Sequence, residues 1–347
     1  MTHQTGAFAM PLDRLSRLAR AISTAVALAA AAGCLAVMPA IAPSAKDVEA
    51  NISADFPYDY EYVDVRGARM AYVEAGDPEG PPILLVHGNP TSAYLWRNVI
   101  PKLERSGRVI AGELIGMGRS DKPAIDYRFA DHAAYFAGFV EAMGLRNVTL
   151  VLHDWGGGVG FDYAARHEDN VRAIAFMEAV AKPMSLKEAD LPTRYLFSRL
   201  RDPKAGWRIA AEDNYFVEKM LPMMSGRQLS EAEMAVYRAP YPTVESRRPV
   251  AQWPREIPLD GEPADNVARI GANFEWLRGA ETPLLFLYGE PGMIFTEDQR
   301  DVLKRELPRM EMVSVGSGFH YLQEVQPSRI GEALAEWIDG APASDDG

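Results

Sequence analysis

The segment from Val148 to Gly158 constrains the fold of this chain more than any other. An uninterrupted apolar run, Val148–Leu152, leads through His153 and Asp154 into Trp155 and three consecutive glycines. Such a run is typical of a buried parallel strand, and a helical pattern follows at Trp155–His167. Glycines let backbones approach closely, so we predict a sharp strand–turn–helix elbow with Asp154 at its apex.

The remaining sequence alternates strand and helix patterns around this elbow. Strands are predicted at Tyr60–Val65, Met70–Glu74, Ile83–Val86, Arg108–Gly112, Val171–Met177, Pro283–Tyr288 and Glu311–Val315, and helices at Leu95–Leu103, Ala130–Met143, Glu297–Glu306 and Pro327–Ile338. This alternation predicts an α/β fold with a doubly wound, mostly parallel sheet. We place the core at 46–180 and 265–347, with a helical cap inserted at 181–264.

The first 45 residues differ in composition from the rest. Three arginines before residue 21 precede an uncharged, alanine-rich stretch from Ala21 to Ala42, which ends in an A-x-A pattern. This order indicates a signal peptide, and hence a periplasmic or secreted protein. Two alternatives stay open: a lipid-anchored N-terminus at Cys34, and an uncleaved anchor. We expect no stable membrane span after processing.

Charge and cysteine content exclude several classes of function. The formal net charge is −12, which does not favour binding to nucleic acid. Cys34 is the only cysteine, so a disulfide framework and a cysteine-rich metal site are both excluded.

Asp154 occupies the apex where a G-x-S-x-G hydrolase carries its serine. A carboxylate that attacks a carbonyl gives a labile anhydride, whereas attack on a saturated carbon gives an ester that water can cleave. The aspartate therefore indicates a substrate with a leaving group on an sp³ carbon. The alternative is that Asp154 only caps the following helix.

The loop His87-Gly-Asn-Pro90 follows a predicted strand and should face the elbow. Its backbone N–H, with that of Trp155, could form an oxyanion hole. The Asn89 amide and the Trp155 indole are uncharged N–H donors suited to a departing halide. The alternatives are an ordinary loop residue and a core aromatic.

A histidine base is also required, and the chain has six histidines. His320 lies after the last strand, where chain order in this architecture places the base, whereas His132 and His167 fall in surface-helix patterns. His87 and His153 flank the two turns and are expected to hydrogen-bond locally. Glu178 and Glu290 each follow a strand, and either could orient the histidine.

Long stretches of the chain resemble the haloalkane dehalogenases. The resemblance runs from about residue 57 to 339 and includes His87-Gly-Asn-Pro-Thr-Ser-Ala-Tyr-Leu-Trp-Arg97, Leu114-Ile-Gly-Met-Gly-Arg-Ser-Asp-Lys-Pro123, His153-Asp-Trp-Gly-Gly-Gly-Val-Gly-Phe-Asp162, and, in the insertion, Asp213-Asn-Tyr-Phe-Val-Glu-Lys-Met-Leu-Pro222, Ser230-Glu-Ala-Glu-Met234 and Trp253-Pro-Arg-Glu-Ile-Pro258. It implies an α/β-hydrolase fold with an eight-stranded sheet. The chain departs from the family pattern at Glu113, where aspartate is usual, and at Val325, where an acid is common.

The resemblance also implies the site residues. It assigns Asp154 as nucleophile, His320 as base, Glu178 in preference to Glu290 as the orienting acid, and Asn89 with Trp155 as the halide site. The implied substrate is a small apolar haloalkane, with water as co-substrate, halide as product, and no metal or organic cofactor. We expect a monomer.

Three other functions remain compatible with parts of the pattern. Epoxide hydrolases share the aspartate and histidine but need proton donors such as the tyrosines at 195, 215, 237 and 241. Coelenterazine luciferases keep a similar set of residues, and a binding-only descendant would keep the cavity without turnover. The Asn89–Trp155 pair favours a halide over an alkoxide leaving group.

Overall fold

The computed structural model describes residues 48–187 and 191–340, so the predicted leader at 1–45 and Cys34 lie outside it. Its centre is one eight-stranded sheet in the order β1-β2-β4-β3-β5-β6-β7-β8. Only the β1–β2 and β2–β4 pairings are antiparallel. The strands are β1 Glu61–Val65, β2 Ala68–Gly76, β3 Pro82–Val86, β4 Arg108–Gly112, β5 Val148–Asp154, β6 Val171–Ala179, β7 Leu284–Pro291 and β8 Glu311–Gly318. The predicted α/β fold with a mostly parallel sheet is confirmed.

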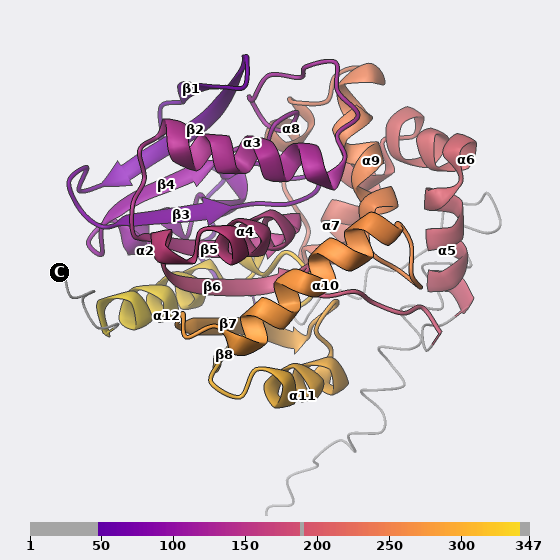
Figure 1. The fold of residues 1–347 in the computed structure, drawn as a ribbon. Helices are drawn as coiled ribbons and strands as arrows, with labels where there is room; N and C mark the ends of the chain where they lie inside the picture. The colour runs from indigo at the N-terminus through magenta and orange to yellow at the C-terminus, as the bar shows by residue number, and fades with distance from the viewer. Residues whose placement is uncertain (1–47, 188–190, 341–347) are drawn as a thin grey trace, which may run out of the picture.

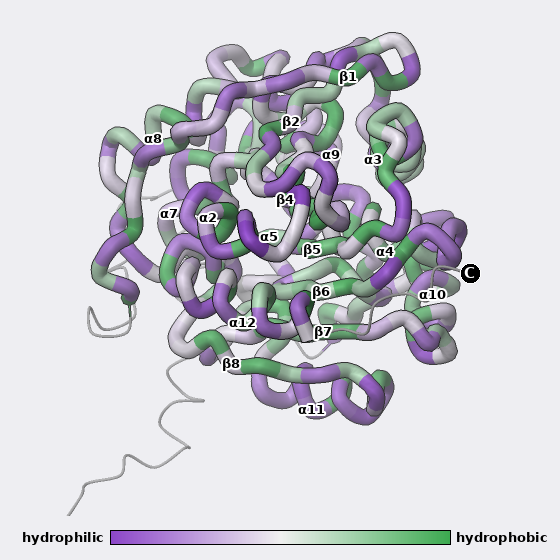
Figure 2. Tube along the Cα trace, turned by 90° about the vertical axis from the view of Figure 1, so that its left-hand side faces the viewer, coloured by the Kyte–Doolittle hydropathy of each residue, from purple (hydrophilic) through white to green (hydrophobic). Residues whose placement is uncertain are grey.

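Helices cover both faces of this sheet (Figure 1). Helices α3 (Phe129–Ala142), α4 (Trp155–Arg166) and α10 (Ala264–Gly279) pack side by side on one face, while α2 (Ile100–Leu103) and α12 (Pro327–Gly340) pack together on the other. The remaining helix of the core is α11 (Glu297–Glu306). Figure 2 shows hydrophobic stretches on the central strands and a hydrophilic α11, as expected for a sheet buried between two helical layers.

Between β6 and β7 the chain forms a group of short helices, and α5, α6 and α9 lie beyond the strand ends in Figure 1. Their bounds are α5 Leu191–Arg201, α6 Pro203–Trp207, α7 Leu221–Met224, α8 Glu231–Arg238 and α9 Arg248–Glu256. Among the described residues of this segment, β pairing is limited to two isolated bridges, which Leu259 forms with Met184 and with Glu262. Within the residues described, no helix is both long and apolar enough to cross a membrane.

One predicted helix differs from the structure. The expected helix Leu95–Leu103 is divided into a 3-10 turn at Ala93–Trp96 and the short α2, which begins at Ile100. Pro101 explains the break, because proline lacks the N–H that would continue the hydrogen bonds of a preceding helix.

Candidate active site

Asp154 lies at the junction of β5 and α4 in a backbone conformation that is rare for residues other than glycine, with φ 51° and ψ −123°. The turn depends on close backbone approach. A Cβ on Gly156 would come within 2.3 Å of the Val86 carbonyl oxygen, and one on Gly88 within 2.1 Å of Asp154 Oδ1. The structure therefore forms the predicted elbow, and a strained conformation at its apex is typical of a functional residue.

The Asp154 carboxylate accepts a hydrogen bond from a backbone donor. Asn89 N–H donates to Asp154 Oδ1 at 2.7 Å, and the backbone N–H of Trp155 helps to lower the pKa of the carboxylate. Burial alone would raise the pKa of Asp154, but the hydrogen bond and positive charge of His320 lower it below the usual value of 3.8. Asp154 is thus a buried, ionised carboxylate, which can act as a nucleophile without a base to activate it.

His320 lies between two carboxylates. Its Nε2 is 3.4 Å from Asp154 Oδ2, and its Nδ1 is 3.4 Å from Glu178 Oε2. Burial lowers the pKa of His320, but the hydrogen bonds and negative charges of Asp154 and Glu178 outweigh it and raise the pKa to about 9. His153 Nε2 lies 2.9 Å from the His320 carbonyl oxygen and helps to hold the loop that carries the base.

Glu178 and Glu290 lie in opposite environments. Glu178 is buried at the end of β6, and its carboxylate accepts hydrogen bonds from three backbone N–H groups in the segment Met293–Phe295, the shortest at 2.7 Å. The Glu290 side chain is 62% exposed and lies 3.8 Å from Arg300. The structure brings Glu178 to His320 and leaves Glu290 at the surface, so the geometry favours Glu178 as the orienting acid.

The two predicted halide donors flank the nucleophile. Asn89 is buried, its backbone bonds Asp154, and its Nδ2 lies 3.4 Å from the Val250 carbonyl oxygen on α9. Trp155 follows Asp154 directly and is buried in a stack on Trp253, with ring centroids 4.4 Å apart. Both side chains thus contact α9 and lie beside the Asp154 carboxylate.

One histidine lies where the sequence analysis did not expect it. His132 was predicted on a helix surface, but it is fully buried and stacks on Trp253 at 3.9 Å. Its spacing from Phe129 and Phe136 on α3 places it on the apolar face, a signal that the helical pattern contained. His167 is exposed, as predicted. His87 bonds Gly88 O locally, as expected, and also accepts from the more distant Leu114 N–H, whereas His153 bonds the distant His320 carbonyl oxygen rather than a local group.

A cavity of about 630 Å³ opens near α9 but does not include the predicted site. Its lining is largely charged and includes Arg128, Arg201, Arg248 and Arg255. None of Asn89, Asp154, Trp155, Glu178 or His320 lines it. Its polarity does not suit an apolar substrate, so we do not assign it as the substrate cavity.

We predict that the free energy of unfolding is highest near pH 6.5 and decreases at both lower and higher pH. His320 is protonated in the fold up to about pH 9, whereas an unfolded histidine titrates near 6.5. The stabilisation from its charged form is complete below pH 6.5 and is lost as the pH rises through 9, a decline of up to about 3 kcal/mol. Below pH 6.5 the cause is different. Burial lowers the pKa of His87 to about 4 and that of His132 and His153 to about 3. These histidines therefore bind protons first in the unfolded state, and the free energy of unfolding decreases as the pH falls below 6.5.

The measurement is the free energy of unfolding in urea at pH 5.5, 6.5 and 9. The variant His320→Gln serves as the control and should show a flatter decline between pH 6.5 and 9. An identical alkaline decline in the parent and the variant would show that His320 is not the group responsible.

Known proteins provide an independent comparison. The alpha/beta hydrolase fold family matches residues 81–327. A haloalkane dehalogenase of Sphingobium indicum is 44% identical over 286 residues, which cover 80% of this chain and 94% of the relative. A haloalkane dehalogenase of Mesorhizobium japonicum is 42% identical, with 80% and 90% of the two chains covered.

Solved structures agree with these relatives. A haloalkane dehalogenase from Bradyrhizobium elkani superposes with a TM-score of 0.80 at 39% identity, covering 82% of this chain and 98% of the other. The structure of a putative ancestral haloalkane dehalogenase gives a TM-score of 0.78 at 42% identity, covering 80% and 98%.

Proposed function

The chain belongs to the α/β-hydrolase fold family and, within it, to the haloalkane dehalogenases, and we propose that it cleaves carbon–halogen bonds through an alkyl ester on Asp154. Its hydrolytic action on carbon–halide bonds follows from that membership. One observation supports the ester route above all: a buried, ionised carboxylate lies between the Asn89 N–H at 2.7 Å and His320 at 3.4 Å. The test is halide and alcohol release by the purified protein, which should be absent from an Asp154→Ala variant.

The first half-reaction is displacement at a saturated carbon. Asp154 Oδ1 accepts the short bond from the Asn89 N–H at 2.7 Å, whereas Oδ2 has only the longer contact with His320 at 3.4 Å, so we assign Oδ2 as the oxygen that attacks. The new carbon–oxygen bond forms as the carbon–halogen bond breaks, and its electron pair leaves with the halide. The Asn89 amide and the Trp155 indole stabilise that anion as its charge develops, which lowers the barrier rather than only improving binding.

The second half-reaction is hydrolysis of the ester. Once Asp154 is esterified it loses the negative charge that helps to raise the pKa of His320, so the imidazole can give up its proton and become a base. His320, oriented by Glu178, then takes a proton from water, and the hydroxide adds to the Asp154 carbonyl carbon. The Asn89 and Trp155 backbone N–H groups stabilise the oxyanion. The ester bond breaks, the alkoxide takes the proton of the new Asp154 carboxyl group, and alcohol and halide are released; the one proton released per turnover is the one that His320 gave up to solvent before it acted as a base.

The proposed halide site predicts a large effect of one ring nitrogen. Trp155→Phe keeps the aromatic stack on Trp253 but removes the N–H donor. We expect kcat/KM for 1-bromohexane to fall roughly 10- to 10³-fold and bromide to inhibit more weakly, because a donor aimed at developing charge is lost. The control is Trp276→Phe, since that indole bonds Glu168 at 3.0 Å on an exposed part of α10. Unchanged kinetics in Trp155→Phe would contradict this halide site.

We also infer how the chain is organised and where it acts. The basic, apolar and small-residue order of residues 1–45 supports a cleaved signal and a periplasmic or secreted enzyme, with a lipid anchor at Cys34 and an uncleaved anchor as the alternatives. We also propose that the enzyme is a monomer. Residues 181–264 are proposed as the cap over the site, and the substrate as a small apolar haloalkane. The intact mass of the exported protein would distinguish a chain that starts near Pro43 from the full-length chain.

A further inference from the structure

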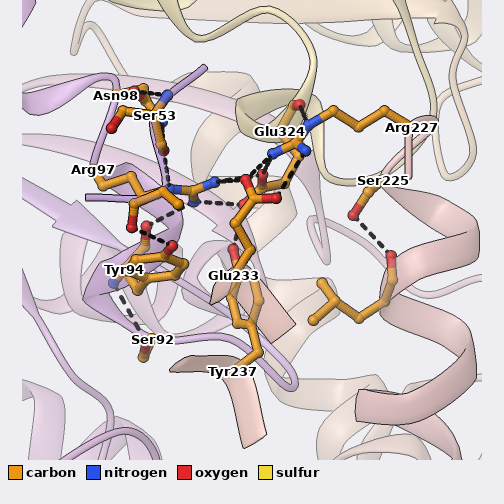
Figure 3. A network of polar contacts seen from close by, with 12 residues as sticks. Ser53, Ser92, Tyr94, Arg97, Asn98, Ser225, Arg227, Glu233, Tyr237 and Glu324 are labelled. Atoms are coloured by element: carbon orange, nitrogen blue, oxygen red, sulfur yellow. Dashed lines mark hydrogen bonds and ion pairs between the residues drawn. The ribbon is translucent and has the colours of Figure 1, made fainter. Parts of the chain in front are cut away.

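A buried cluster of charges joins three segments of the chain, two of which carry site residues (Figure 3). Arg97 lies at the end of the loop that begins with His87 and Asn89, and Glu324 lies four residues after His320. The third segment is the cap between α7 and the end of α8, which supplies Arg227, Glu233 and Tyr237. We refer to these five residues as the strap cluster.

The strap cluster is closely hydrogen-bonded. Arg97 contacts Glu324 through both of its terminal nitrogens, at 2.7 and 2.8 Å, and Glu233 at 2.8 Å. From the cap side, Arg227 contacts Glu233 at 2.5 and 3.1 Å and the Glu324 carboxylate at 2.5 Å. Tyr237 donates its hydroxyl hydrogen to Glu324. The cluster contains two arginines and two glutamates, so its formal net charge is zero.

Burial makes this arrangement sensitive to the loss of any member. The side chains of Arg97, Glu233 and Glu324 are at most 4% exposed, and that of Arg227 is 13% exposed. A buried charge whose partner is removed keeps its desolvation cost without the compensating attraction. The cluster thus holds its three segments in one relative position, which an exposed ion pair would not do.

The cap segment also forms hydrogen bonds to backbone atoms of the loop that carries His320. The carbonyl oxygen of Met224 lies 3.3 Å from the backbone nitrogens of both His320 and Tyr321, which donate to it. Arg227 Nε–H donates to the Glu324 carbonyl oxygen. Tyr321 in turn donates its hydroxyl hydrogen to the Asn89 carbonyl oxygen at 2.9 Å. The cap segment therefore contacts both ends of the short loop from His320 to Glu324.

We propose that Arg227 is a positioning residue for the base: it docks the cap onto the His320 loop and so sets the place from which His320 activates water. Arg227 is the cap member that bonds both the side chain and the backbone of Glu324. This inference rests on the proposed function, because it assigns the docking to the hydrolysis half-reaction. Among the described residues, Arg227 hydrogen-bonds Gln228, Glu233 and Glu324, and none of these bonds reaches the β5–α4 elbow or the Asn89 N–H that hold Asp154.

The proposal predicts an unequal effect on the two half-reactions. Without Arg227, the attack of Asp154 on the haloalkane should proceed at the parental rate, while ester hydrolysis slows because His320 is misplaced. A displacement of a catalytic group by about 1 Å can cost up to about 10²-fold in rate. A purely structural role would instead reduce the folded fraction and lower both half-reactions equally.

The experiment is rapid-quench kinetics of Arg227→Gln with 1-bromohexane, following bromide release and the ester on Asp154 by mass. We expect alkylation within about twofold of the parent, ester hydrolysis slower by about tenfold or more, and ester accumulating in the steady state. The matched control is Arg238→Gln at the end of α8, the helix that carries Glu233 and Tyr237; the ion pairs of Arg238 with Glu218 and Glu231 are partly exposed and touch no part of the His320 loop. It should behave as the parent in both steps.

Two further variants keep the test decisive if Arg227→Gln does not fold. Arg227→Lys retains the charge but cannot bridge the Glu233 carboxylate and both acceptors of Glu324, so its hydrolysis rate should be intermediate. Arg227→Gln with Glu233→Gln restores charge neutrality, and hydrolysis should remain slow in the folded double variant. Equal slowing of both steps, or no slowing of hydrolysis, would overturn the role of Arg227. A parent that releases no bromide would instead overturn the proposed function itself.

Discussion

Replacing His320 with phenylalanine is expected to stop the reaction after one equivalent of halide per active site. Asp154 would still attack from its ionised form, because Asn89 N–H still holds the carboxylate at 2.7 Å, although loss of the hydrogen bond and charge of His320 raises the pKa of Asp154. No base would then activate water. A positioned general base contributes about 10²- to 10⁴-fold to the rate, so hydrolysis of the ester should slow by about that factor. The enzyme should accumulate as an alkyl ester on Asp154.

The measurement combines a halide burst with intact mass and peptide mapping after exposure to excess 1-bromohexane. His167→Phe is the control, since His167 is exposed at the end of α4 and stacks only on Tyr163. That variant should turn over as the parent does. Continued turnover by His320→Phe, or a folded variant with no adduct on Asp154, would show that His320 is not the base of an ester mechanism.

The second large effect concerns stability, and it follows from Arg97 in the strap cluster. All five guanidinium N–H groups of Arg97 have acceptors: the carbonyls of Ser53 and Tyr94, and the carboxylates of Glu233 and Glu324. Arg97→Met fills the space but leaves Glu324, which is fully buried, short of its main partner. We expect the free energy of unfolding to fall by about 3–5 kcal/mol.

Chemical denaturation of the purified variants measures this effect. Arg69→Met is the matched control, because its ion pair with Asp121 is 3.2 Å long and both side chains are well exposed, so its loss should cost less than about 1 kcal/mol. Adding Glu324→Met to Arg97→Met should recover part of the loss, since no buried charge then lacks its partner. Equal destabilisation by Arg97→Met and Arg69→Met would refute the account of the cluster.

The architecture was predictable because local sequence carries most of the information that it needs. β5 is largely apolar up to His153 and is followed by Trp155 and glycines, and its partners β3 and β6 are also rich in apolar residues. Asp154 and His320 are candidates for the same reason, since each lies at a strand end in a distinctive turn. The break before Pro101 is not apparent from the apolar spacing, which continues through the proline.

Other features depend on contacts that no local pattern encodes. Glu178 and Glu290 were both predicted to follow strands. They differ because Glu178 is buried and accepts hydrogen bonds from the distant segment Met293–Phe295, whereas Glu290 is exposed. The strap cluster pairs Arg97 with Glu324 across 227 positions of sequence. In the sequence, nothing distinguishes its charged members from surface charges, because the contacts that bury them form only in the folded chain.

The central claim is that Asp154 forms the covalent intermediate through which this protein removes halide from haloalkanes. The most direct test is bromide release by purified residues 46–347 from 1,2-dibromoethane and 1-bromohexane, beside an Asp154→Ala variant that folds equally well. We predict steady release by the parent and none above background by the variant. Equal release by both proteins, or none by a folded parent, would contradict the claim.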